Sequence, residues 1–118
     1  MHIQTAIKNW RRDIRRGVLK MCVLMLLSRG EMYGYEISKT LEMLSGGVLR
    51  IDEGTLYPML RRLENEGYVV AEWRFHGGKA RRYYRITSKG VLFLEAINDF
   101  WRRLVNAVDR IIGGDADE

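Results

Sequence analysis

The stretch Asp52–Val69, DEGTLYPMLRRLENEGYV, has the apolar spacing of a helix but opens with residues that form helices poorly. Its apolar residues recur at intervals of three and four, at Leu56, Met59, Leu60 and Leu63. This spacing predicts a helix with Asp52 as its N-cap and Gly67 as its C-terminal stop. Gly54 and Pro58 both lower the helix propensity of the first two turns. A requirement other than helix stability therefore selected the residues of those turns.

The segment before this helix predicts two further helices. A basic stretch, Lys8–Lys20, leads into an apolar helix that ends near Gly30, and a second helix covers about Tyr33–Leu44. The inward stripe of the second helix consists of Ile37, Leu41 and Leu44.

After Gly67 the hydrophobic period changes to two. Apolar and polar residues alternate on both sides of Gly77-Gly78, which predicts two antiparallel strands joined by a tight turn. Positive charge concentrates on the second strand, at Lys79, Arg81, Arg82 and Arg85. Thr87 or Ser88 then caps a last long helix that runs to about Ile112.

Three helices followed by a basic hairpin have the order of a winged helix-turn-helix. The expected fold class is therefore mainly α (α+β), with a two-stranded β wing and a long C-terminal dimerisation helix. We expect a DNA-binding domain with a basic N-terminal arm at residues 1–87, the dimerisation helix at 88–112 and a disordered acidic tail at 113–118. No repeat or low-complexity linker marks a second domain.

The composition fits one soluble globular domain with an anionic partner. The chain has 118 residues, of which 47% are hydrophobic and 30% charged, and its net charge of +5 favours nucleic acid or an acidic membrane surface as partner. The single cysteine, Cys22, lies among apolar residues, which predicts a buried side chain. The longest apolar run, Met21–Leu27, is too short to span a membrane, so we expect a cytoplasmic protein without a membrane partner.

The winged-helix order explains the residues of the opening turns. A recognition helix presents small and polar groups at its N-terminal turns, where the base edges of the DNA major groove come closest. Gly54 allows close approach, and Thr55 offers a hydroxyl and a methyl group. The candidate DNA-binding residues are Tyr35, Lys39, Thr55, Tyr57, Arg61, Arg62, Lys79, Arg81 and Arg82. Two alternatives stay open, since Tyr57 can cover the edge of the core and Arg61 and Arg62 can be solvated helix charges.

Six short motifs stand out along the chain: Arg16-Gly17, Gly34–Ile37, Gly54–Pro58, Arg62–Glu64 with Gly67, Arg82–Tyr84 and Thr87–Gly90. Together they resemble the PadR family of transcriptional regulators. The Gly-Thr-Leu-Tyr-Pro block together with the Arg-Tyr-Tyr strand is the specific part of the match, which covers roughly Arg16–Ile112. The resemblance implies a homodimeric winged-helix DNA-binding protein, usually a repressor, whose C-terminal helix dimerises and whose effector differs between members.

The last helix carries more apolar surface than a core of this size needs. One stripe contains Phe93, Ile97, Phe100, Leu104 and Ile111, and a neighbouring stripe contains Leu94, Trp101, Val105, Val108 and Ile112. One of them would be exposed on a monomer, so we expect a homodimer that pairs two recognition helices with a pseudo-palindromic operator. The expected dimer seam consists of Ile97, Trp101, Leu104, Val108 and Ile111. Trp101 either packs in this seam or faces its symmetry mate across a slot for a small aromatic effector.

The leading interpretation is a sequence-specific DNA-binding transcriptional regulator, a repressor, with release by a small aromatic ligand as a further hypothesis. The alternative is a winged-helix module that docks on another protein without DNA specificity of its own. No nucleophile with a histidine base, acid pair or P-loop indicates an enzyme, and no cofactor is expected. His76 is interpreted as a loop residue, and no metal site is expected.

Overall fold

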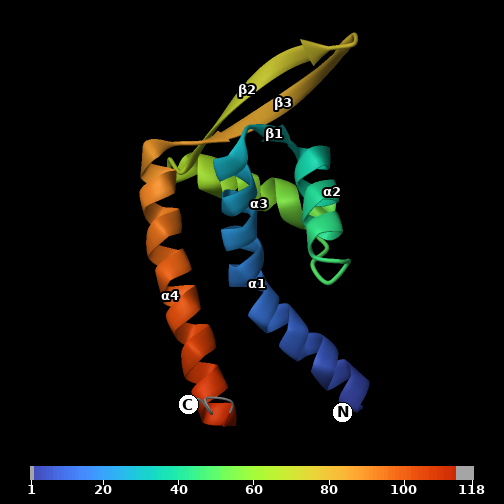
Figure 1. Cartoon of the computed structure of the whole chain (residues 1–118). Helices are drawn as coiled ribbons and strands as arrows, with labels where there is room; N and C mark the ends of the chain where they lie inside the picture. Colours follow the sequence, from blue (N-terminus) through green and yellow to red (C-terminus); the bar gives the residue numbers. More distant parts are fainter. Residues whose placement is uncertain (1, 114–118) are drawn as a thin grey trace.

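In the computed structural model, which describes residues 2–113, the chain forms four helices and a small antiparallel sheet that lies at one end of the molecule (Figure 1). The elements are α1 (Ile3–Arg29), β1 (Met32–Tyr33), α2 (Gly34–Leu44), α3 (Glu53–Asn65), β2 (Val69–His76), β3 (Lys79–Ile86) and α4 (Ser88–Ile112). This is the mainly helical winged helix-turn-helix that the sequence predicts. Of the predicted acidic tail, only Gly113 lies within the described residues.

The helix predicted from the opening stretch is α3. Its N-cap is Asp52, whose side-chain oxygen Oδ1 accepts a hydrogen bond from the Thr55 backbone N–H at 2.9 Å. At its other end Gly67 has a φ of 84°, and the Tyr68 N–H donates to the Leu63 carbonyl oxygen at 2.9 Å. This is a Schellman motif, which requires the left-handed conformation that glycine adopts without strain.

The core lies between the C-terminal half of α1, α2, α3 and the sheet. Its fully buried side chains are Leu24, Leu27, Ile37, Leu56, Leu60, Leu63, Val23 and Val69. The prediction of an inward stripe on α2 is correct for Ile37 and Leu41 and wrong for Leu44, which is 59% exposed. Leu44 is on the same face, but it is the last residue of α2 and lies beyond the core.

The sheet has the strand order β1-β3-β2, with both pairings antiparallel. The wing is the predicted hairpin of β2 and β3, and its turn residues Gly77 and Gly78 have φ angles of 60° and 81°, as a type I′ turn requires. The sequence did not predict β1, which pairs Met32 and Tyr33 with β3. Two residues are too few to show an alternating pattern.

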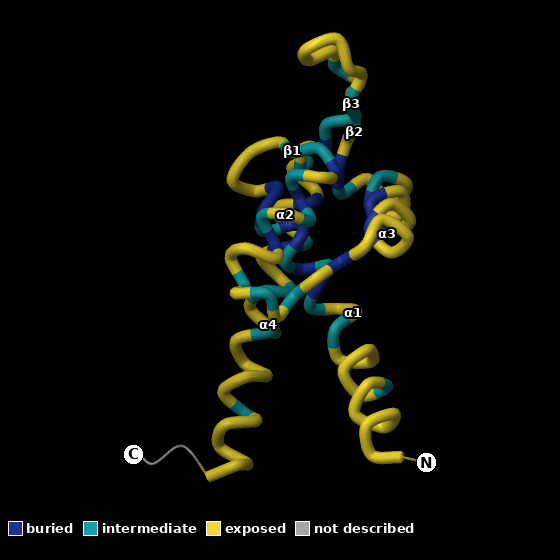
Figure 2. The backbone as a smooth tube through the Cα atoms, turned by 90° about the vertical axis from the view of Figure 1, so that its right-hand side faces the viewer, coloured by how far each residue is buried: buried dark blue, intermediate teal, exposed yellow. Residues whose placement is uncertain are grey.

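Two helical segments extend beyond the core. The basic stretch and the apolar helix after it form one continuous helix, α1, and residues 3–18 of it, here called the α1 arm, contain no buried residue. In α4 only Gly90 and Leu94 are buried, and both lie in its N-terminal turns. Both segments project from the domain on the side away from the wing, diverge from each other toward their ends, and are mostly exposed (Figures 1 and 2).

Candidate nucleic-acid interface

The exposed side of α3 faces the wing across a cleft of about 610 Å³. Four of the candidate DNA-binding residues line this cleft, from α3 and from β3: Tyr57, Arg61, Arg81 and Arg82. The N-terminus of α2 closes one end of it with Tyr33 and Gly34. The fold therefore brings candidates from α3 together with candidates from β3 that are at least 81 − 61 = 20 positions away in the sequence.

Tyr57 lies directly against the N-terminus of α2. A Cβ atom added at Gly34 would come within 2.6 Å of the Tyr57 hydroxyl oxygen, so glycine at this position makes room for the ring. The Tyr57 side chain nevertheless stays 39% exposed. Both interpretations of Tyr57 are thus compatible with its place, because it covers the edge of the core and presents part of its ring outward.

Gly54 occupies open space in the first turn of α3. A Cβ atom added there would meet a single described neighbour, Asp52 Oδ1, at an ordinary contact distance of 3.5 Å. Its φ is not in the left-handed region either. Pro58 removes the backbone donor that would bond to the Gly54 carbonyl oxygen. Nothing within the described chain therefore requires the glycine, and its carbonyl lacks its usual i+4 donor.

Arg82 connects the wing to α3. Its guanidinium Nη2 donates to Glu64 Oε2 at 2.8 Å, and both side chains are about one-third exposed. The guanidinium also lies over the Trp73 ring, 5.6 Å from its centroid. Much of the Arg82 charge is therefore balanced within the protomer, which the sequence did not indicate because the two partners are 18 positions apart.

Arg74, in the half of β2 nearer the turn, makes a second connection between the wing and the rest of the domain. Its guanidinium forms a bidentate ion pair with Glu31, in which Nη2 and Oε1 are 2.8 Å apart, and it also contacts Glu72. It lies over the Tyr83 ring at 5.2 Å. The pair joins residues that are 43 positions apart, so it fixes the wing to the segment just before β1.

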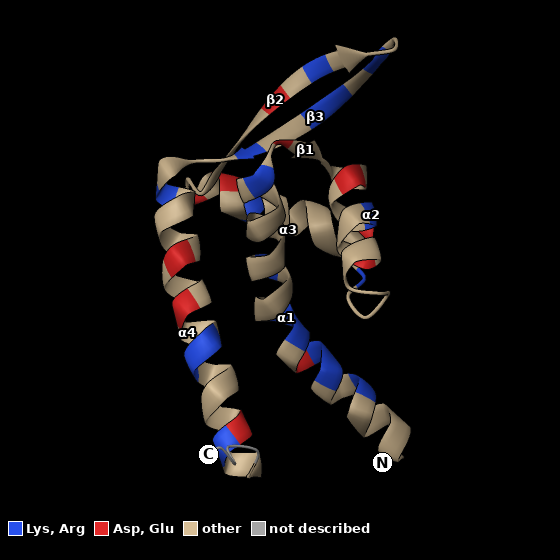
Figure 3. Cartoon of the chain, viewed as in Figure 1, with Lys and Arg blue, Asp and Glu red and all other residues tan. Residues whose placement is uncertain are grey.

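Arg81 and the candidates Tyr35, Lys39 and Lys79 carry side chains that are stacked or exposed. Arg81 stacks on the Tyr33 ring at 4.5 Å, and Tyr33 in turn stacks on the exposed Tyr35 at 6.4 Å. Lys39 on α2 and Lys79 at the wing tip are exposed. Lys and Arg gather on β3 and on the lower half of α1 (Figure 3).

Thr55 and Arg62 are on a different side of α3. They line a second groove, of about 890 Å³, whose other wall is the α1 arm. The sequence singled out the positive charge of the arm but did not predict that it meets α3. No local signal indicates this contact, because it depends on how α1 crosses α3.

The residues expected in a dimer seam fall into two groups. Ile97 and Trp101 are half-buried and pack against the core of their own protomer. Leu104, Val108 and Ile111 are exposed, at 41%, 44% and 84%. The core-facing stripe of α4 thus continues on the same helix face past the point where the core ends.

Little in the described residues suggests a metal site or a reactive thiol. Residues 2–113 hold no group of three or more His, Cys, Asp or Glu side chains arranged for a metal ion. Cys22 is half-buried, and burial raises the pKa of its thiol, which makes it a weaker nucleophile. Among the described helices, none is both long and apolar enough to cross a bilayer.

Comparison with known proteins gives consistent matches over most of the chain. The model of the transcriptional regulator PadR-like family matches residues 23–96. A transcriptional regulator of Mycobacterium tuberculosis is 33% identical over 103 residues, which are 87% of this chain and 91% of that protein. The negative transcriptional regulator PadR of Bacillus subtilis is 31% identical over 74 residues, which are 41% of its length. The crystal structure of a PadR family regulator from Eggerthella lenta superimposes with a TM-score of 0.81 at 34% identity, covering 93% of this chain and 95% of that one.

Proposed function

Because this chain belongs to the PadR-like family of transcriptional regulators, we propose that it represses transcription by binding a pseudo-palindromic DNA operator as a homodimer. One observation carries the DNA-binding part of the proposal. The exposed first turn of α3 contains Gly54, which the packing of the protomer does not require, at the position where a recognition helix approaches base edges. In this proposal residues 1–87 bind DNA and residues 88–112 form the dimerisation helix.

Within this interface the candidates have different roles. Thr55, Tyr57 and Arg61 are exposed on α3 and are assigned to base edges or the adjacent sugar and phosphate groups. Tyr35, Lys39, Arg62, Lys79 and Arg81 are assigned to phosphate contacts. Arg82 is shared between DNA and Glu64, so its main effect is to hold the wing in place.

The dimer is supported by apolar surface that the protomer leaves uncovered. Exposed apolar side chains follow one face of the distal half of α4, at Phe100, Leu104, Val108 and Ile111. A second exposed row follows the α1 arm, at Ile3, Ile7, Trp10 and Ile14. Rows of this length on projecting helices are typical of interfaces between copies of a chain.

The proposal also includes release of DNA by a small planar aromatic ligand that binds beside Trp101. Trp101 packs against the core of its own protomer. The other two tryptophans, Trp10 and Trp73, lie elsewhere in the sequence and serve as fluorescence controls. Fluorescence quenching by a panel of planar aromatics would be measured on the wild type and on Trp101→Ala, which retains the other two tryptophans. Loss of quenching and of DNA release in a still dimeric variant supports the slot, whereas persistence of both refutes it.

The salt dependence of duplex binding distinguishes DNA binding from the alternative function, a protein-docking module. Binding to duplex DNA selected from a random pool would be titrated between about 50 and 200 mM salt. If six or more phosphates are contacted, affinity falls about 1,000-fold or more over this range. A protein that binds no duplex at any of these salt concentrations would favour the docking module.

A further inference from the structure

The α1 arm and the first turns of α3 form the two walls of the 890 Å³ groove, here called the basic groove. Six cationic side chains line it: Lys8, Arg12, Arg15, Arg16, Arg50 and Arg62. Asp52, which caps α3, is the one carboxylate among the lining residues. Gly54, Thr55 and Pro58 also line the groove, so the recognition helix itself forms part of its wall.

The positive charge of this groove is poorly balanced within the protomer. Its lining residues comprise six cationic side chains and one carboxylate, Asp52, which gives them a net charge of 6 − 1 = +5, equal to that of the whole chain. Among the described residues, the groove cations make two ion pairs, both exposed: Arg12 with Asp13 at 3.9 Å and Arg50 with Glu42 at 3.5 Å. A hollow surface with such an excess of one charge concentrates ions of the opposite charge.

The arm separates its charge from its apolar surface. At 100° per residue, Lys8, Arg12 and Arg15 fall on the same side of the helix as Leu19, which packs in the core. The exposed apolar row of the arm, Ile3, Ile7, Trp10 and Ile14, falls on the opposite side. If that row is covered by a second copy of the chain, the basic side therefore stays accessible.

The groove also lies in a suitable place for a long polyanion. In Figure 2, α3 lies between the wing, above it, and the α1 arm, below it, and the three elements share one side of the molecule. A duplex whose major groove holds α3 continues past both ends of this surface. On one side its backbone meets the wing, and on the other side it meets the basic groove.

We propose that the basic groove binds the phosphate backbone of the duplex beside the half-site, on the side away from the wing. This inference rests on the proposed DNA-binding function and adds a third contact surface to the recognition helix and the wing. Because phosphates are the same in every sequence, the groove contributes affinity and register without specificity.

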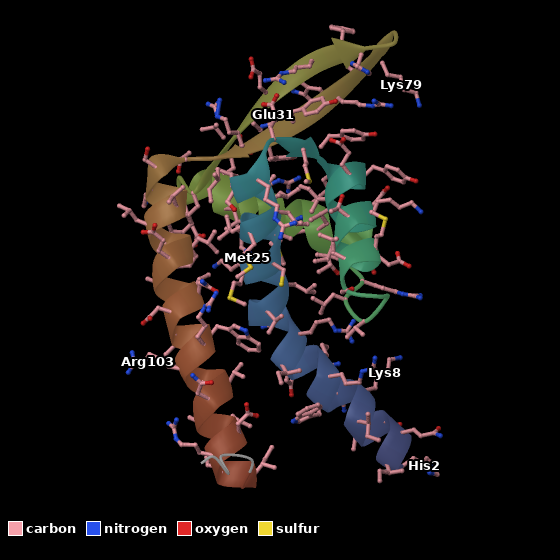
Figure 4. The ribbon with its side chains drawn as sticks, viewed as in Figure 1. His2, Lys8, Met25, Glu31, Lys79 and Arg103 are labelled. Atoms are coloured by element: carbon pink, nitrogen blue, oxygen red, sulfur yellow. The ribbon has the colours of Figure 1, made fainter. Side chains whose placement is uncertain are left out.

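The test compares two variants with the same change in charge. The arm variant is Arg12→Gln, Arg15→Gln and Arg16→Gln, and the control variant is Arg102→Gln, Arg103→Gln and Arg110→Gln on α4. Glutamine keeps the helix propensity of arginine. Figure 4 shows that Arg103 lies on the far side of α4 from Lys8 and the arm. Affinity for the selected operator and for a scrambled duplex would be measured as a function of salt.

We expect the arm variant to lower the slope of log affinity against log salt by about 0.9 for each phosphate that it no longer neutralises, roughly 2.7 in all. At about 0.1 M salt this corresponds to a fall in affinity of about 100-fold or more, for operator and scrambled duplex alike. The control variant should leave the slope nearly unchanged. Hydroxyl-radical footprinting should show reduced protection only on the flank of each half-site away from the wing.

The other possible outcomes show which part of the reasoning fails. A wild type that binds no duplex refutes the proposed function itself. A wild type that binds, together with an arm variant of unchanged slope or a control variant of equally reduced slope, refutes only the groove. Duplex binding that is unchanged, while binding to anionic phosphatidylglycerol vesicles is abolished, would assign the arm to a membrane surface instead. If the triple variant misfolds by circular dichroism, Lys8→Gln and Arg62→Gln test the two walls singly, each with an expected decrease of about 0.9 in slope.

Discussion

Gly54→Ala should stabilise this protein and weaken its binding to DNA. In the free protomer the added methyl group meets only Asp52 Oδ1, at 3.5 Å, and the backbone φ suits alanine. Alanine is favoured over glycine within a helix by about 0.5–1 kcal/mol. For a chain of 118 residues this raises Tm by roughly 2–5 °C.

The expected effect on DNA has the opposite sign. If base edges or sugar groups approach the α3 backbone at Gly54, the methyl group forces the helix outward and weakens the neighbouring interactions. One good base contact is worth about 1–3 kcal/mol, or roughly 5- to 150-fold in affinity. Thermal unfolding by circular dichroism and anisotropy titration of the selected operator measure the two quantities on the same preparation.

Two other glycines provide controls for this experiment. At Gly90 a Cβ atom would lie 2.2 Å from the backbone oxygen of Tyr68, so Gly90→Ala should destabilise the fold without touching the DNA surface. At Gly34 the methyl group would displace the Tyr57 ring, so Gly34→Ala should affect both stability and binding. The reasoning is refuted if Gly54→Ala is more stable and still binds the operator with wild-type affinity.

The other predictions concern the wing, the dimer and pH. Arg61→Ala should weaken operator binding by about 1–3 kcal/mol and relax specificity at one position. Arg82→Ala should weaken binding to operator and scrambled duplexes alike, and it should lower the free energy of unfolding by about 0.5–1 kcal/mol because it leaves Glu64 without its partner. Equal, unchanged affinities for both variants would remove this surface from the interface. Leu104→Asp should leave the protomer folded, because the residue is 41% exposed. It should place an unpaired carboxylate in the expected dimer seam, so that analytical ultracentrifugation finds a monomer. A wild type that is itself monomeric at about 50 µM would contradict the seam. Burial raises the pKa of the Cys22 thiol and of the Tyr84 phenol above their ordinary values of 9.0 and 10.0. The contribution of these two groups to the free energy of unfolding should therefore be constant below about pH 9 and be lost at higher pH, because the unfolded chain releases these protons more easily. A free energy of unfolding that rises above about pH 9 in urea titrations would show that the two groups are not protected in this way.

The fold was largely predictable because its elements carry strong periodic patterns. The apolar spacing in α3 and the alternation around Gly77-Gly78 are local signals, and both gave elements of the right type and place. β1 gave no signal because a strand of two residues is defined only by its partner on β3. The prediction that Leu44 is buried was wrong for a related reason, because periodicity gives the inward face of a helix but not the point where the core ends.

The candidate site was less predictable, because its geometry depends on contacts between distant segments. The pattern indicated that Arg82 is basic and on the wing, but its partner Glu64 is on another element. Arg74 and Glu31 likewise meet only in the folded chain. The charge of the α1 arm was evident from the sequence, whereas the groove that it forms with α3 follows from the crossing of the two helices.

If the chain dimerises as proposed, dimerisation and phosphate binding in the basic groove should depend on one another. The α1 arm has no buried residue in the protomer, and an isolated helix of this length is marginal in water. A second copy that covers its apolar row would hold the arm helical and keep its cationic side turned toward the DNA. Dissociation by Leu104→Asp should therefore do more than separate the two half-sites. It should also reduce the salt slope per bound protomer, because an arm that frays neutralises fewer phosphates than an arm held in place.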